Sequence, residues 1–311
     1  MKRLSILLAG IAALAACQKH LSVDTPNMSI AINNSSSTAT TKMQADTFLY
    51  NLGDTVRFAF IGTTGNLIVY TGDVTHNYDY KDRTAALGAT TLSFSSTIAN
   101  TGQTNTLKLL ATDKLPGLDS ASIVNASWTD ITTRAAFATN ATAVASGNIT
   151  LTDLASGPND SLFVAFKYVG ATGSIQPTWT ITGFTVNNVL PDVTYNLTSL
   201  TDAALFTKVK VAPSTSPTWV ASTTSLALTG GAATNANNTS YIVTKPLYVG
   251  RVLPDYSIPL INLNGYSNNA TATSYYYKYA AKGTYKIVFL AFNNTAAEQA
   301  TSTQTFYVKV Q

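Results

Sequence analysis

Apolar side chains recur at every second position along most of this chain, in short runs that Gly, Asn, Pro and Ser interrupt. Residues 56–60 (VRFAF), 107–111 (LKLLA) and 285–291 (YKIVFLA) show the pattern. Successive side chains of a strand point to opposite faces, whereas a surface helix repeats about every 3.6 residues, a period almost absent beyond the N-terminus. Since no helix-length segments separate the runs, the sequence predicts an all-β protein built from packed sandwiches.

The composition restricts both the partners and the source of stability. Charged residues make up 11% of the chain, against about 25% in an average domain. The formal net charge is +4 and falls to +2 without Lys2 and Arg3, and the remaining cations are scattered. This excludes a basic surface for nucleic acid. With a single cysteine the chain forms no internal disulfide, so stability has to come from buried cores, and its length allows two.

The first twenty residues, MKRLSILLAGIAALAACQKH, have the pattern of an export signal: two cations and then an apolar run too short to span a membrane. The run ends in Leu14-Ala15-Ala16-Cys17, which matches the bacterial lipobox, where cleavage leaves a lipidated N-terminal cysteine. The alternative is a buried thiol behind an ordinary signal peptide. We predict a signal peptide at 1–16, a lipid anchor at Cys17 and a lipidated tether over 17–27; several acyl chains would hold the protein stably.

A family resemblance enters at residues 56–83, VRFAFIGTTGNLIVYTGDVTHNYDYKDR. A D-x-V-x-F strand followed by a strand with a Gly-Asp turn resembles the first half of a PKD-type, Ig-like domain. The second half of such a domain, Y-x-Y followed by G-T-Y and an alternating strand, comes only at 275–289. The resemblance implies an Ig/PKD-like sandwich of residues 28–83 plus 272–311, split by a domain inserted at 84–271.

The inserted segment carries WTDIT, LFVAFKY and PTWTI, which resemble the galactose-binding-like or choice-of-anchor jelly rolls of secreted bacterial proteins. With F-x-F-x-G, I-x-Y-T-G-D and Y-x-Y-x-x-R at 58–83, the chain is similar to a Bacteroidetes lipoprotein family, domain of unknown function 5017. The resemblance implies an outer-membrane lipoprotein that works beside glycan-uptake machinery, with a polysaccharide or an outer-membrane transporter complex as partner. Residues 18–22 lack the acidic residues typical of surface-exported members, so both the cell surface and the periplasmic face stay open.

Charged residues gather around one turn, Asp73 to Arg83, in a chain that is otherwise poor in charge. Its carboxylates, Asp73, Asp79 and Asp82, are weak candidates for a structural calcium site, because Ca²⁺ takes oxygen ligands. If the segment is extended, however, Tyr78 and Tyr80 face the core and Asp79 faces solvent. We favour the structural interpretation, and we expect no other cofactor.

Catalytic patterns are weak. His20 and His76 are the only histidines, and the chain has no G-x-S-x-G, no H-E-x-x-H and no phosphate-binding glycine loop. A pair of carboxylates for glycoside hydrolysis stays open, because such pairs are distant in sequence. We therefore expect a protein that is not an enzyme, with a glycan-active hydrolase as the least favoured alternative.

Aromatic residues are the stronger lead, since the chain has 16 Tyr and 3 Trp, whose flat faces stack on sugar rings. Trp128 and Trp179 lie in strand-like motifs and are expected in the core. Trp219 follows a loop-like stretch (APSTSPTW) and is the best candidate for an exposed ring; the alternative is that it plugs a sandwich edge. Loop positions add further speculative binding residues: Tyr248, Tyr256 and Tyr266.

These observations predict a membrane-anchored, non-catalytic lipoprotein that binds carbohydrate or serves as a cell-surface accessory protein of a glycan-uptake system. The alternative is a structural or adhesive lipoprotein whose sheets contact another protein. The ligand and the oligomeric state do not follow from the sequence.

Overall fold

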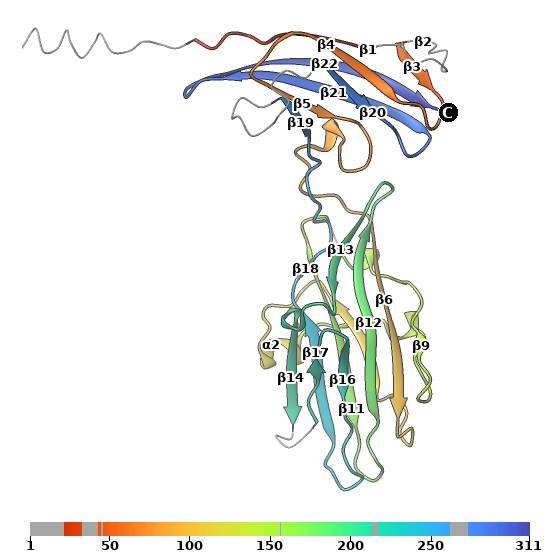
Figure 1. The fold of residues 1–311 in the computed structure, drawn as a ribbon. Helices are drawn as coiled ribbons and strands as arrows, with labels where there is room; N and C mark the ends of the chain where they lie inside the picture. Colours follow the sequence, from red (N-terminus) through yellow and green to blue (C-terminus); the bar gives the residue numbers. More distant parts are fainter. Residues whose placement is uncertain (1–21, 33–42, 45, 156, 213–216, 262–272) are drawn as a thin grey trace, which may run out of the picture. The chain divides into compact units, whose positions relative to one another are not determined.

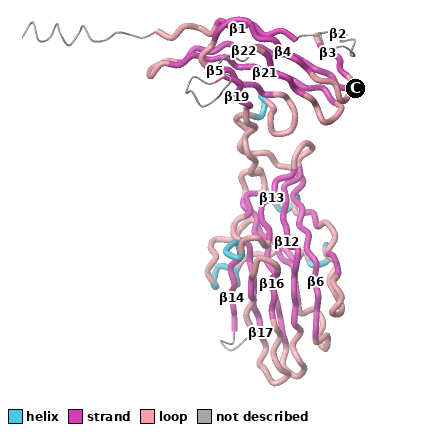
Figure 2. Tube along the Cα trace, viewed as in Figure 1, coloured by secondary structure: helices cyan, strands magenta, loops and turns pink. Residues whose placement is uncertain are grey.

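The computed structural model describes residues 22–32, 43–44, 46–155, 157–212, 217–261 and 273–311 (Figure 1). Cys17 and Tyr266, with the predictions made for them, lie outside these ranges. The described residues form strands almost throughout, with one α-helix of six residues and four short 3-10 turns (Figure 2). The predicted all-β class is therefore confirmed. Within the described part of the chain, no helix has the length and apolar character needed to cross a membrane.

The chain divides into two compact units. Residues 1–82 and 254–311 together form what we call the split unit, and residues 83–253 form the inserted unit. The chain therefore returns from the inserted unit to the split unit between residues 253 and 254, earlier than the expected return between residues 271 and 272. The reason is β19 (Ile258–Ile261), which pairs antiparallel with β5 (Asn66–Tyr70) and so joins the split unit.

Two sheets make up the split unit. One has three strands in the order β1-β4-β20, and the other has six in the order β19-β5-β21-β22-β3-β2. The remaining strands of this unit are β1 (Asn27–Ile32), β2 (Met43–Gln44), β3 (Thr47–Tyr50), β4 (Val56–Thr63), β20 (Ser274–Tyr277), β21 (Gly283–Asn294) and β22 (Gln299–Val310). Their inward faces share one core, in which the ring of Phe58 lies 4.8 Å from that of Phe289.

A side chain joins the two sheets of the split unit where no strand pairing does. The amide of Gln304 on β22 accepts a hydrogen bond from the backbone N of Ile30 at 3.0 Å and donates to the carbonyl of Met28 at 2.6 Å. Gln304 thus satisfies the outer backbone groups of β1, an edge strand that would otherwise present them unpaired.

The inserted unit is a second pair of sheets. Their orders are β10-β6-β12-β16-β15, with β9 and β13 attached, and β14-β17-β11-β7-β8, with β18 attached. The strands are β6 (Ala89–Ala99), β7 (Leu107–Thr112), β8 (Thr129–Asp130), β9 (Val144–Ala145), β10 (Ile149–Thr150), β11 (Ser161–Gly170), β12 (Thr178–Val189), β13 (Thr194–Ser199), β14 (Phe206–Ala212), β15 (Val220–Ala221), β16 (Ser225–Leu228), β17 (Asn238–Thr244) and β18 (Leu247–Tyr248).

Side chains from both sheets fill a common core of the inserted unit, which includes Phe94, Phe166 and Trp179. The sheet that holds β11 is apolar on its outer face as well, because α2 (Ser120–Asn125) covers it with Ile123, beside a partly buried Trp128. This explains why LFVAFKY lacks alternation: β11 is buried on both faces over most of its length.

Candidate functional site

A hollow lined by aromatic and aliphatic side chains lies at one end of the inserted unit. The chain enters and leaves this unit at the other end, where the N–H of Ala86 donates to the carbonyl of Gly250 at 2.7 Å. From there β6 runs for 11 residues, a length of about 36 Å at the usual rise per residue. The hollow opens where β6 ends and β12 begins, and we call it the end cleft.

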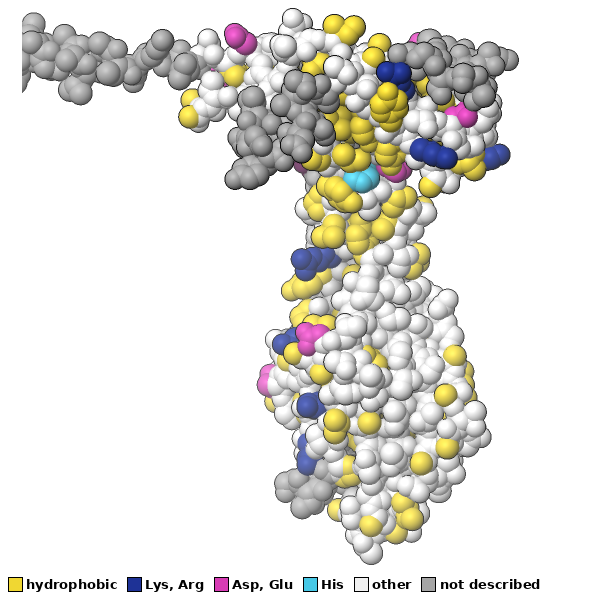
Figure 3. All heavy atoms as spheres, viewed as in Figure 1, with side chains coloured by type: hydrophobic (Ala, Val, Ile, Leu, Met, Phe, Trp, Pro, Cys, Tyr) yellow, Lys and Arg dark blue, Asp and Glu magenta, His cyan; other side chains and the backbone are white. Residues whose placement is uncertain are grey.

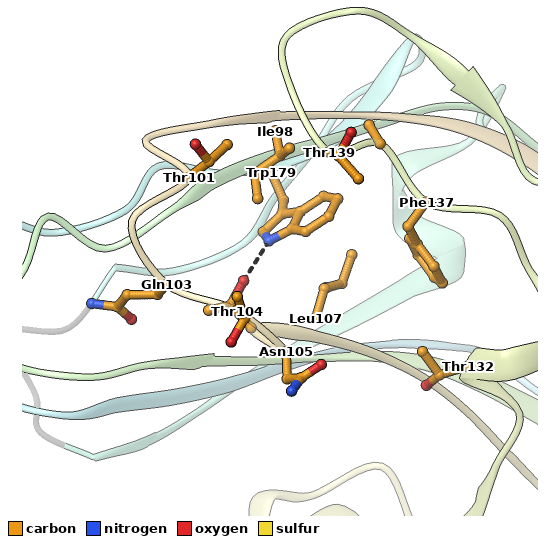
Figure 4. A pocket seen from close by; sticks show the side chains of 12 residues that line it. Ile98, Thr101, Gln103, Thr104, Asn105, Leu107, Thr132, Phe137, Thr139 and Trp179 are labelled. Carbon is orange, nitrogen blue, oxygen red and sulfur yellow. Dashed lines mark hydrogen bonds between the residues drawn. The ribbon is translucent and has the colours of Figure 1, made fainter.

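Aromatic and aliphatic side chains form the floor of the end cleft (Figure 4). The indole Nε1 of Trp179 donates to the hydroxyl of Thr106 at 3.0 Å, which fixes the orientation of the ring. The ring of Phe137 meets it edge-on, with centroids 6.1 Å apart. Ile98 and Leu107 complete the floor. The result is a rigid apolar surface with a partly exposed aromatic ring, Phe137, at its side.

One wall is the connection between β6 and β7, residues 100–106. Gln103 anchors it: its amide nitrogen donates to the carbonyls of Ala171 and Ser174 at 2.7 and 3.1 Å, and its amide oxygen accepts from the N–H of Ala171 at 2.8 Å. Asn105 has φ 55°, the left-handed region that Asn tolerates better than most residues. These hydrogen bonds tie the wall to residues 171–174.

The opposite wall runs over residues 132–139. The N–H of Ala138 donates to the hydroxyl of Ser96 at 3.0 Å, which ties this wall to β6. At its start the hydroxyl of Thr132 donates to Asp130 at 2.6 Å. This hydrogen bond, together with Lys108 at 2.9 Å, lowers the pKa of Asp130 to about 2, so the carboxylate stays ionised and keeps Thr132 in place.

The chemistry of the end cleft is neutral. Its volume is about 340 Å³, and none of the described residues that line it carries a titratable side chain. The groups that make no hydrogen bond within the described structure are three hydroxyls and one amide, on Thr101, Thr104, Thr139 and Asn105. On the face shown in Figure 3, the charged side chains of the inserted unit are few and gather along one side. Such a site can hold an uncharged ligand with an apolar face and a hydroxylated rim.

Trp219, the best candidate for an exposed ring, is buried. Only 1% of its surface is accessible, and its ring lies 6.2 Å from that of Phe166 in the core. The residue precedes β15, which pairs with β16 at the margin of its sheet, so the indole closes the side of the sandwich. The alternative weighed in the sequence, a plug at the sandwich edge, describes its position.

Two other speculative binding residues, Tyr248 and Tyr256, belong to different units. Tyr248 is 51% exposed in the inserted unit, and Tyr256 is 60% exposed in the split unit. The Tyr256 ring lies edge-on to His76, whose Nδ1 is 2.7 Å from the Tyr256 carbonyl oxygen. Tyr256 thereby secures the segment that returns to the split unit.

The three carboxylates considered for calcium have separate partners. Asp73 accepts hydrogen bonds from the hydroxyls of Tyr277 and Thr71, Asp79 pairs with Lys286 at 2.6 Å, and Asp82 pairs with Lys81. Over the described residues, no group of three or more His, Cys, Asp or Glu is arranged to hold a metal ion.

The segment that contains Asp79 is not extended either. Tyr78–Tyr80 form a 3-10 turn, capped by the side chain of Asn77, which accepts from the N–H of Asp79. Alternation therefore does not apply, and Tyr78 instead packs edge-on against Tyr70, at 5.4 Å between centroids.

Sequence reasoning missed the end cleft because it arises from pairings across the chain. Trp179 was assigned to the core, and with 6% of its surface exposed it belongs there, yet it also forms the floor. Neither Phe137 nor Asn105 lies in a recognisable sequence motif. A left-handed Asn in the loop 100–106 leaves no pattern distinct from the other Asn-rich turns.

Fold and site together define an all-β protein with a discontinuous first unit and an uncharged, aromatic-floored cleft in its inserted unit. The chain belongs to the family described as "Domain of unknown function (DUF5017)", whose sequence profile matches residues 16–205. Neither the curated proteins nor the solved structures that were compared with the chain include a match.

Proposed function

We propose that this protein is a membrane-anchored, non-catalytic lipoprotein that binds a neutral glycan in the end cleft. In this proposal Cys17 carries the lipid and the protein serves an outer-membrane glycan-uptake system, at the cell surface or facing the periplasm. The proposal includes the finer assignments made from the sequence, a Bacteroidetes lipoprotein with a PKD/Ig-like split unit and a galactose-binding-like jelly roll as inserted unit.

One observation carries the glycan proposal: the end cleft joins an aromatic floor to a rim of unused hydroxyl and amide groups, with no charge among its described lining residues. A pyranose ring has an apolar face of C–H groups and an edge of hydroxyls, so it matches both parts. The volume of about 340 Å³ lies at the lower end of the range for ligand pockets, about 300–1,000 Å³.

The test is affinity electrophoresis of the chain without its signal peptide, in gels that contain neutral polysaccharides. We expect retardation by at least one glycan, and we expect Phe137→Ala to weaken binding about tenfold, the equivalent of about 1.4 kcal/mol. Tyr248→Ala is the matched control, because Tyr248 is an exposed aromatic of the same unit outside the cleft. No retardation by any neutral glycan, or equal retardation of Phe137→Ala and the native protein, would contradict the proposal.

The anchor is tested separately, in the cell that makes the protein. Cys17→Ser removes the thiol that would be acylated, so we expect this variant to leave the membrane fraction and to lose incorporation of labelled palmitate. Continued partition of the variant with membranes would show that Cys17 is not the anchor. This outcome would leave the assignment of the end cleft intact.

A further inference from the structure

We infer that the outer face of the three-stranded sheet in the split unit rests on the membrane surface and contacts phospholipid headgroups. We call this surface the β4 face. It consists of the side chains of β1, β4 and β20 that point away from the core, among them Ser29, Arg57, Ile61 and Tyr276. The inference rests on the lipid anchor of the proposed function, and it specifies which part of the protein that anchor holds against the bilayer.

The length of chain between the anchor and the fold gives the first argument. Ser22, the first described residue, follows Cys17 by five residues, which span at most about 18 Å when fully extended. The fold then holds the chain at once, because the Asn293 side-chain amide donates to the carbonyl of Asp24 at 2.8 Å and Pro26 is buried. Strand β1 begins at the next residue. A lipid on Cys17 would therefore keep the split unit close to the bilayer, with one of its surfaces toward the headgroups.

The charge of the β4 face suits this contact. Strands β1, β4 and β20 contain no Asp or Glu, and their single cation is Arg57. Its guanidinium lies 5.1 Å from the ring centroid of Tyr276, the residue directly opposite in the sheet. No carboxylate in the described part of the chain forms an ion pair with Arg57. A guanidinium binds phosphate through two parallel hydrogen bonds, so Arg57 is available to the phosphate of a lipid headgroup.

The apolar groups of the β4 face suit a bilayer surface as well. Tyr276 is 54% exposed, and Ile61 is 71% exposed. A tyrosine ring with its hydroxyl is favourable at the boundary between headgroups and water, and an isoleucine gains when it enters the boundary with the acyl chains. Ile61 pairs with Ser29 near the start of β1, and Arg57 lies four residues away along β4, about 13 Å. The contacts are therefore spread along the sheet, as a face that lies flat on a bilayer requires.

The other surfaces of the split unit fit the bilayer less well. The hairpin turn between β21 and β22, beside the tether, carries Glu298, which anionic lipids repel. The outer face of the six-stranded sheet is partly covered, because Tyr78 packs on Tyr70 and Asp79 pairs with Lys286. The chain leaves for the inserted unit just after this turn. Figure 1 shows β1 and β4 on the side of the split unit away from β5 and β19. Contact through the β4 face thus leaves both links to the inserted unit free.

The test uses the mature lipoprotein in vesicles of phosphatidylethanolamine and phosphatidylglycerol. Because the thiol of Cys17 is bonded to the lipid, an introduced cysteine is the one reactive thiol of the protein. An NBD fluorophore is attached at Ser29→Cys on the β4 face, or at Thr303→Cys, an exposed position on the outer face of the six-stranded sheet. Relative to the unlipidated chain in buffer, we expect iodide quenching to fall about threefold or more at position 29 and to stay unchanged at position 303.

Two substitutions test the residues assigned to the contact. In the protein labelled at position 29, Arg57→Glu places a carboxylate against the lipid phosphates, and Tyr276→Ala removes the aromatic ring. Each should raise iodide quenching toward its value in buffer. Lys309→Glu and Tyr307→Ala are the matched controls, because they make the same changes at exposed positions of β22, and they should leave quenching as it is. Circular dichroism checks that every variant is folded.

Equal quenching at positions 29 and 303 in vesicles would overturn the inference and leave the lipid anchor standing. Protection of position 29 in the unlipidated chain without vesicles would show that a second copy covers the β4 face, and would also overturn it. Quenching that is the same in Arg57→Glu, Tyr276→Ala and the native sequence would contradict the assignment of these residues. Failure of the protein to float with vesicles would overturn the proposed anchor and this inference together, while glycan binding in the end cleft would be unaffected.

Discussion

Trp219 has the largest of the fully buried side chains in the described structure, and it closes the inserted sandwich beside Phe166. Its indole Nε1 is buried without a hydrogen-bond partner among the described residues. The apolar ring, and not the N–H, therefore accounts for the stabilisation that Trp219 provides. A large aromatic side chain that packs against a core contributes mainly through the surface it removes from water and the space it fills.

The dominance of ring packing predicts different stability losses for two substitutions of Trp219. Trp219→Ala leaves a cavity and should cost about 3–5 kcal/mol of unfolding free energy, while Trp219→Phe keeps most of the packing and should cost clearly less. Val220→Ala is the matched control, because Val220 is 61% exposed and should change stability by less than about 0.5 kcal/mol. Urea unfolding followed by circular dichroism measures all three. Equal losses for the Ala and Phe variants would contradict the assignment of this stability to the packing of an aromatic ring.

The burial of Trp219 could not be read from its neighbours. The stretch APSTSPTW contains two prolines and polar residues, which predict a loop. What buries the ring is the pairing of β15 with β16 and the core built from β11, and both are long-range. Residues inside regular strands, such as Phe58, follow the local period, and Phe58 is fully buried.

At the scale of elements, β20 and the start of β21 bring together a cluster of tyrosines. Tyr279 and Tyr285 stack with centroids 3.8 Å apart, and Tyr277 lies 4.9 Å from Tyr279. The hydroxyl of Tyr279 donates to the Thr71 carbonyl at 2.7 Å, and that of Tyr277 donates to Asp73. Burial raises the pKa of Tyr277 to about 12, and it also raises the pKa of Tyr279.

The tyrosine cluster predicts an alkaline limit to stability. Because the folded pKa of Tyr277 lies above the unfolded value of about 10, its contribution is complete below pH 10 and is lost as the pH rises through about 12. Tyr277→Phe should reduce the slope of unfolding free energy against pH in this range, whereas the exposed Tyr276→Phe should not. Phenolate absorbance should rise in two steps, the second coinciding with unfolding. A single step near pH 10 with the fold intact would contradict the prediction.

Strands with a strong alternation of apolar and polar residues were predictable from the sequence. Two elements, β19 and the turn Tyr78–Tyr80, were not, and each has a physical cause. The pattern of 285–291 matches β21, in which Ile287 and Phe289 enter the core. In contrast, β19 contains Pro259 and a register shift, and proline cannot donate to a ladder, so nothing local predicted a strand there. The turn at Tyr78–Tyr80 departs from alternation because Asn77 caps it.

At the scale of the whole molecule, the two units differ in how their strands are supplied. The inserted unit is one continuous segment with its own core, whereas the split unit pairs β4 with β20 and β5 with β21 across the insertion. The half-motifs at 56–83 and 275–289 were enough to predict a discontinuous domain. The residue at which the chain returns to the split unit could not be predicted in this way, because it depends on the pairing of β19 with β5.

This difference predicts that residues 83–253 fold when expressed alone and keep the glycan binding that we propose for the end cleft. Residues 22–82 alone should stay unfolded, because β5 lacks its partner β21. Circular dichroism and urea unfolding distinguish the two outcomes. A cooperative transition for 22–82, or its absence for 83–253, would contradict the assignment of independent cores.

Because the split unit is discontinuous, its strands are synthesised in two stages. Synthesis supplies β1 to β5 first, and then about 170 residues of the inserted unit before β19 to β22 exist. At roughly 5–20 residues per second, this interval lasts roughly ten to thirty seconds. During it, β1 to β5 lack the later strands that complete their two sheets and their core, while the inserted unit can already fold. The half-made split unit is therefore the stage of biogenesis most prone to aggregation, and the folding rate of the inserted unit does not shorten it.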